Sequence, residues 1–184
     1  MTEIDTSKTV SELEIDGTNI PLAVTSKLPQ VADNTVISLT VNDLDGATII
    51  KENFLSACTS LVSIEIPNSV TSIRNSAFLG CGSLASITLP DSLTSIYNWV
   101  FEGCSSLTSI TIPSRVRSIG LGVFQNCNNL TTMRIEATKP PMLMNTNAIS
   151  TATTKIYIPA GTLSAYQSAT NWSNFASLFE ELPA

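Results

Sequence analysis

The chain has 184 residues, of which 43% are hydrophobic and 13% charged, and it contains no histidine. This composition allows one substantial core and excludes an intrinsically disordered chain, which has few apolar residues and many charges. The formal net charge is −6. With no visible basic patch, this charge argues against nucleic acid and against an anionic membrane surface as partners.

The N-terminal region is the least regular part of the sequence. It has neither the basic n-region nor the apolar h-region of a secretory signal, so either the chain is not exported by that route or a signal has been removed. No apolar run reaches the roughly 18 residues that cross a bilayer, so membrane insertion is not expected. Leu13 and Ile15 precede Leu39 and Val41 by 26 positions. We interpret residues 1–36 as an atypical first turn or a capping hairpin.

Asp43 and Asp45, followed by Gly46, are the one faint hint of a calcium turn. A polar turn within a slightly longer first unit explains the same residues. We prefer that interpretation, and no metal or cofactor is predicted.

A 23-residue repeat fills the middle of the chain, residues 37–136. Several columns of apolar residues recur in phase, which is typical of a solenoid whose units bury their apolar faces only when they stack. The columns are Cys58, Cys81, Cys104 and Cys127; Leu61, Leu84, Leu107 and Leu130; Ile64, Ile87, Ile110 and Met133; Ile66, Leu89, Ile112 and Ile135; Ile50, Ile73, Ile96 and Ile119; and Leu55, Phe78, Phe101 and Phe124.

Each repeat contains one segment, L-x-x-I-x-I, with the two-residue alternation of a strand. Pro67, Pro90 and Pro113 follow it, where a residue without an N–H must end the strand. Ile156 and Ile158 continue the register after Met133 and Ile135. The predicted strands lie near residues 13–15, 37–41, 62–66, 85–89, 108–112, 131–135 and 155–158.

Residues 137–184 hold the last strand and a different kind of segment. Pro140 and Pro141 predict an irregular loop over 138–150. After Pro159, apolar and aromatic residues recur at roughly helical spacing, and Thr162 or Ser164 is a candidate N-cap. We expect a C-terminal helical cap whose aromatic side chains cover the last turn of the solenoid, because exposed solenoid ends need caps.

The repeat unit C-x-x-L-x-S-I-x-I-P-x-S-V-x-S-I, followed by A-F, resembles the BspA-like leucine-rich repeat. The tail IYIPAGTLSAYQSATNWSNF is similar to the closing segment of such bacterial proteins. The resemblance implies a single repeat domain over 1–184: a curved right-handed solenoid with a parallel concave sheet. It also implies exposure at the cell surface or outside the cell, binding to host proteins, matrix or other cells, and no catalysis. Three residues differ from this consensus unit: Trp99 and Gly122 occupy a variable position, and Met133 replaces isoleucine.

The four cysteines are interpreted as buried thiols that act as small core residues. Stacked coils bring equivalent Cα atoms within disulfide range, so a disulfide stays an alternative, as does a metal. No enzyme is predicted, because the chain has no histidine, no special nucleophile and no glycine-rich phosphate loop.

The outward positions of the strands are the first candidate binding surface. They form two polar columns on the sheet, which offer either a hydroxyl-rich recognition face or a merely solvated one. The candidates in the repeats are Ser63, Ser86, Ser109 and Thr132 in one column, and Glu65, Thr88, Thr111 and Arg134 in the other. Ser38 and Thr40 continue the two columns upstream.

Tyr97 and Trp99 are the second candidate, because the repeat does not require aromatic residues there. Exposed Tyr and Trp are enriched at binding hot spots. The preferred alternative is that Gly120 and Gly122, one repeat later, accommodate the rings.

The leading hypothesis is a non-enzymatic protein-recognition or adhesion module that presents a curved polar surface to a protein or glycan partner, with a host-derived partner among the candidates. The alternative is a structural or host-recognition component of a larger assembly such as a phage particle. Since no export signal is visible, a virion or cytoplasmic location stays open beside the cell surface.

Overall fold

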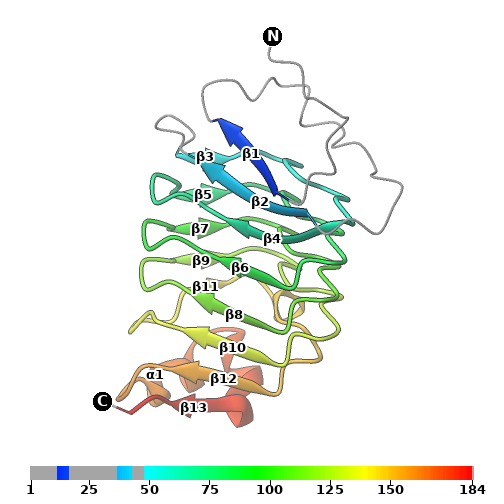
Figure 1. Ribbon diagram of the computed structural model, residues 1–184. Helices are drawn as coiled ribbons and strands as arrows, with labels where there is room; N and C mark the ends of the chain where they lie inside the picture. The colour runs from blue at the N-terminus through cyan, green and yellow to red at the C-terminus, as the bar shows by residue number, and fades with distance from the viewer. Residues whose placement is uncertain (1–11, 17–36, 43–47, 184) are drawn as a thin grey trace.

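The protein is a stack of coils that share two sets of parallel strands (Figure 1). The computed structural model describes the backbone of residues 12–16 and 37–42, and all of residues 48–183. Each repeat contributes one longer strand to one side of the stack and one two-residue strand to the other. We call these sides the front face and the rear face. The faint calcium turn at residues 43–46 and most of segment 1–36 lie outside the described residues.

The front face contains all seven strands that the sequence predicts, and one more at the C-terminal end. Neighbouring strands pair in parallel, as stacked coils require, except at β6 and β8, which do not pair with each other. They are β1 (Glu12–Asp16), β2 (Ile37–Asn42), β4 (Leu61–Glu65), β6 (Ser86–Thr88), β8 (Ser109–Ile112), β10 (Thr132–Ile135), β12 (Lys155–Ile158) and β13 (Phe179–Glu181).

The N-terminal strand continues the stack. Leu13 pairs with Leu39 and Ile15 with Val41, which is the register that the sequence spacing indicates. The pairing of β1 with β2 is parallel, whereas the strands of a hairpin pair antiparallel. These two strands therefore do not form a hairpin with each other.

The rear face is a single five-stranded parallel ladder that the sequence analysis did not predict. Its strands are β3 (Ile49–Ile50), β5 (Ser72–Ile73), β7 (Ser95–Ile96), β9 (Ser118–Ile119) and β11 (Met142–Leu143). The isoleucine column predicts inward side chains but no strand, because two residues are too few to show a strand period.

The prediction of an irregular loop over 138–150 is wrong for its middle part. Leu143 pairs with Ile119 and replaces isoleucine in the rear column, and η3 (Thr146–Ala148) follows as a turn of 3₁₀ helix. Pro140 and Pro141 lie just before β11, so their missing N–H groups interrupt no ladder.

The coils close through turns that use left-handed backbone at two positions in each repeat. One position is held by Asn53, Ser76, Trp99 and Gly122, and the other by Ala57, Gly80, Gly103 and Asn126. Most of these are residues for which a positive φ is inexpensive, whereas Trp99 has a bulky side chain and a φ of +55°.

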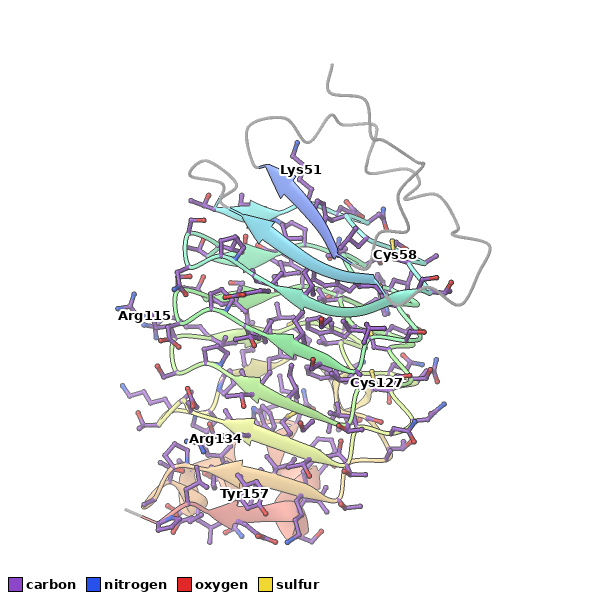
Figure 2. The ribbon with its side chains drawn as sticks, in the orientation of Figure 1. Lys51, Cys58, Arg115, Cys127, Arg134 and Tyr157 are labelled. Atoms are coloured by element: carbon purple, nitrogen blue, oxygen red, sulfur yellow. The ribbon has the colours of Figure 1, made fainter. Side chains whose placement is uncertain are left out.

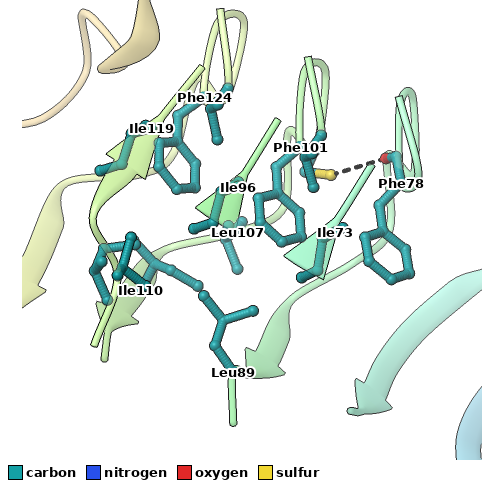
Figure 3. Close-up of a cluster of buried hydrophobic side chains, with 14 of the residues drawn as sticks. Ile73, Phe78, Leu89, Ile96, Phe101, Leu107, Ile110, Ile119 and Phe124 are labelled. Atoms are coloured by element: carbon teal, nitrogen blue, oxygen red, sulfur yellow. Dashed lines mark hydrogen bonds between the residues drawn. The ribbon is translucent and has the colours of Figure 1, made fainter. Parts of the chain in front are cut away.

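The core consists of the predicted columns. Phe78, Phe101 and Phe124 are fully buried and stack in a file, with ring centroids 5.5 and 5.6 Å apart (Figure 3). The backbone N–H of Phe101 also donates to the carbonyl of Val123 on the next coil, at 3.0 Å. Ile87 departs from the rest of its column, since its side chain is only partly buried.

Cys81, Cys104 and Cys127 are buried as core residues, as predicted, and Cys58 at the end of the column is half-buried. The thiols of Cys104 and Cys127 donate to the carbonyl oxygens of Phe78 and Phe101 on the preceding coil, at 3.3 and 3.0 Å. The cysteine column therefore ties neighbouring coils together with polar contacts inside the core.

The C-terminal cap buries aromatic residues, as expected, but it is only partly helical. It comprises α1 (Leu163–Ser168), the 3₁₀ helix η4 (Trp172–Leu178) and strand β13, which contains Phe179. Tyr166 and Trp172 are fully buried and meet edge to face, with centroids 5.7 Å apart. β13 extends the front ladder beyond β12, so a strand rather than a helix ends this side of the stack.

Thr162 occupies the N-cap position of α1, but its side chain does not cap the helix. Its hydroxyl donates instead to the carbonyl of Pro159, at 2.6 Å. The N–H of Leu163 is satisfied by a carboxylate oxygen of Glu181 on β13, at 2.8 Å. The partner of this helix start is therefore distant in the sequence, which local capping rules do not anticipate.

Candidate functional site

The described residues contain no group of three or more cysteine, aspartate or glutamate side chains that could hold a metal ion. Burial raises the pKa of Cys58, raises the pKa of Cys81 and Cys127 to about 12, and raises that of Cys104 even further. A thiol must ionise to become a nucleophile or a metal ligand. The cysteine column therefore offers no reactive group near neutral pH.

The predicted polar columns lie on the front face, where strand alternation places them outside while Ile64, Ile110 and Met133 point into the core. Ser63 and Thr132 are half-buried. The exposed members are Glu65, Ser86, Thr88, Ser109, Thr111 and Arg134. Register brings them together, since Thr111 pairs with Arg134 and Glu65 with Thr88. The structure therefore gathers all eight predicted front residues on one surface.

The front strands form two ladders of four, β1-β2-β4-β6 and β8-β10-β12-β13. β6 and β8 lie next to each other in the stack but do not pair as strands (Figure 1). Ser86, Thr88, Ser109 and Thr111, all exposed, flank this seam. The hydroxyl-rich centre of the front face therefore coincides with the break between its two ladders, where Ile87 is also partly uncovered.

The C-terminal end of the front face is charged, and apart from Arg134 its residues are not among the candidates predicted from the sequence. Arg134 forms an ion pair with Glu136 at 3.3 Å, and Lys155 forms one with Glu180 at 2.9 Å. Tyr157 follows Arg134 in the same outward column, and both labelled side chains project from neighbouring strands in Figure 2. Counting 23 residues on from Thr132 and Arg134 would have found Lys155 and Tyr157.

The pairing with Glu180 raises the pKa of Lys155, chiefly through their hydrogen bond. Both side chains are about half exposed, so water screens the attraction and the pair adds little stability. These charges therefore make the C-terminal end of the front face more polar, but they do little to stabilise the fold.

Tyr97 and Trp99 lie on the other side of the molecule, where the chain leaves rear strand β7. The guanidinium of Arg74, one coil earlier, lies 4.4 Å from the centre of the Tyr97 ring, which is a cation–π contact. Trp99 is 40% exposed, and its indole lies against Gly122 of the next coil. The glycine interpretation is thus confirmed for Gly122, although the indole also keeps an open surface.

The four exposed large hydrophobic side chains among residues 48–183 are all on this rear side. Ile49 and Met142 belong to rear strands, and Met144 and Trp99 follow such strands. The front face therefore differs in chemistry from the rear, with hydroxyl and charged groups on one side and isolated apolar groups on the other.

The stacked parallel strands, the buried columns and the short closing turns together define a leucine-rich-repeat solenoid. The family model described as the BspA type leucine rich repeat region matches residues 35–142 in six copies. The chain belongs to this family. Curated proteins gave no match.

Solved structures of bacterial leucine-rich-repeat proteins are similar to this chain. The T. pallidum leucine-rich-repeat protein TpLRR is 28% identical, with a TM-score of 0.61 over 66% of this chain and 58% of that chain. A leucine-rich cell surface protein from Faecalibacterium prausnitzii A2-165 is 26% identical, with a TM-score of 0.47 over 67% of this chain and 38% of that one. This chain therefore matches little more than half of the first protein's length.

Within the described residues, no helix combines the length and apolar character that a membrane-spanning helix needs.

Proposed function

We propose that this chain is a non-catalytic protein-recognition or adhesion module that holds a protein or glycan partner on its front face. The observation that carries this proposal is the set of exposed polar side chains on strands whose opposite side is buried in a continuous core. Ser86, Thr88, Ser109 and Thr111 offer hydroxyl groups around the seam, and Arg134 is exposed beyond them.

The scaffold supports recognition because ordering the front face costs little when a partner binds. Backbone pairing between coils and the phenylalanine file hold the strands in place before binding. Many weak hydrogen bonds from preorganised hydroxyl groups then add to specificity. Leucine-rich repeats typically serve as binding modules, and the BspA-type resemblance supports a location at the cell surface or outside the cell.

Binding to a panel of purified extracellular-matrix proteins and immobilised glycans tests this function. The front variant combines Thr88→Lys and Thr111→Lys, which place long cations in the centre of the face. The matched control combines Met142→Ala and Ile49→Ala on the rear face. We expect the front variant, but not the control, to weaken binding about tenfold or more. A ligand that binds the front variant with unchanged affinity would contradict the proposal.

A further inference from the structure

We propose that the exposed indole of Trp99 is a stacking platform for a glycan, specifically for a pyranose ring with a continuous apolar C–H face such as β-linked glucose or N-acetylglucosamine. The inference goes beyond the proposed function, because it concerns the rear turn and not the front face.

The backbone at Trp99 is the first argument. Its φ of +55° lies in the left-handed region, which a bulky side chain rarely adopts. The equivalent residues in the neighbouring coils are Ser76 and Gly122, so the turn itself does not need an aromatic residue. Strain that persists at an exposed position indicates that the side chain serves a purpose other than folding.

The packing of the indole against Gly122 is the second argument. A Cβ on Gly122 would lie 2.7 Å from Cδ1 of Trp99 and 3.0 Å from Nε1, so the missing side chain makes room for the ring. The ring is thereby supported by the next coil while 40% of the residue stays exposed. A supported aromatic ring loses little conformational freedom when a ligand stacks on it.

The polar groups around the indole favour a sugar over an apolar peptide. Oε1 of Gln125 would lie 3.0 Å from the same Cβ position on Gly122, so an amide lies beside the indole. Tyr97 lies two residues before Trp99, and the guanidinium of Arg74 on the preceding coil lies over the Tyr97 ring. The face of an indole attracts weakly positive C–H groups, while amide, phenol and guanidinium groups bond to ring hydroxyls. A peptide hot spot needs a desolvated pocket, whereas the indole lies against a glycine and near an amide.

The test uses the full chain and the two indole N–H resonances of its NMR spectrum, one from Trp99 and one from Trp172. Trp172 is fully buried and its Nε1 donates to the carbonyl of Pro141, so it reports folding and not surface binding. We expect titration with cellohexaose or chitohexaose to shift the Trp99 resonance alone, and to protect Trp99 fluorescence from acrylamide quenching.

Variants separate a binding role from a structural one. Trp99→Asn should weaken oligosaccharide binding about tenfold or more, yet leave the melting temperature unchanged or higher, because Asn tolerates a positive φ. Trp99→Tyr should retain part of the binding, and Met142→Ala should retain all of it. A lower melting temperature for Trp99→Asn would indicate a structural residue and overturn the proposal.

The ligand class is tested in the same titration. If neither oligosaccharide shifts the Trp99 resonance, or if only a proline-rich peptide does, the glycan proposal is wrong. Front-face binding by the double lysine variant is measured separately, so failure of this inference and failure of the proposed function are distinguishable.

Discussion

The indole of Trp99 and the missing side chain of Gly122 are complementary across two adjacent coils. An added Cβ at Gly122 would come within 2.7 Å of the indole, and Gly122 itself has a φ of +57°. A substitution at Gly122 therefore destabilises the fold in two ways, through a steric clash and through an unfavourable backbone conformation. Only the clash depends on Trp99.

Gly122→Ala should therefore lower the free energy of unfolding by about 2–3 kcal/mol, combining overpacking with the left-handed penalty. In a Trp99→Ala background the steric part is removed, and the same substitution should cost only about 1 kcal/mol. Urea denaturation of the four proteins in this double-mutant cycle measures the coupling. Additive effects would mean that the two residues do not touch.

Phe101→Ala should destabilise the protein by about 3–5 kcal/mol, because a fully buried ring between two stacked rings is removed. Met142→Ala, at a side chain that is 60% exposed, should change stability by less than about 0.5 kcal/mol. Thermal and urea unfolding measure both. A near-neutral Phe101→Ala would contradict the buried file.

Gly120→Ala should cost more than Gly161→Ala. A Cβ on Gly120 would lie 2.6 Å from the backbone carbon of Tyr97, which cannot yield without moving a coil. Gly161 has nothing within 4 Å of its Cβ position. Gly161→Ala should therefore incur only the conformational penalty for a φ of +75°, about 1 kcal/mol. We expect about 2–3 kcal/mol for Gly120→Ala. Equal unfolding midpoints for the two variants would refute the close approach of these coils.

Tyr166→Phe tests the C-terminal cap. The hydroxyl donates to the carbonyl of Ala137 at 2.7 Å inside the core, and its loss leaves that carbonyl without this partner. The expected cost is about 1–3 kcal/mol. Ser168→Ala, which removes an exposed hydroxyl on the same helix, is the matched control and should be near neutral.

The buried thiols predict a loss of stability at alkaline pH. Burial raises the pKa of Cys127 from 9.0 to about 12, so the unfolded chain releases its proton first. The protonated thiol thus favours the folded state fully below pH 9, and this contribution is lost as the pH rises from 9 towards 12.

Cys127→Ala should reduce the fall in stability between pH 9 and 10.5 by up to about 1 kcal/mol per pH unit, relative to the wild type. Urea unfolding at a series of pH values measures this slope. Met142→Ala should show the wild-type slope. If Cys127→Ala does too, the thiol ionises equally in both states and the inference fails.

Much of the fold followed from the repeat period. Equal spacing means that equivalent residues, such as Phe78 and Phe101, lie directly above one another once the coils stack, so their burial could be predicted without coordinates. The same logic placed Ser86 and Thr88 on an outward face, because side chains alternate along a strand. It also recovered the register of the N-terminal strand from Leu13 and Leu39.

Other features depend on contacts between residues that are distant in the sequence. The two-residue strands of the rear ladder carry too little periodicity to be recognised, and they exist because neighbouring coils satisfy their backbone groups. For the same reason Glu181 rather than Thr162 completes the start of α1. The break between β6 and β8 also appears only in the assembled stack.

The sequence by itself determined the period, the inward columns and the polar outward positions, since all three depend on local spacing. Only the tertiary structure decided that Trp99 has left-handed backbone, rests on Gly122 and keeps part of its ring exposed. The physical reason is that exposure and backbone strain arise from how one coil lies against the next, and a linear pattern records only which residues recur.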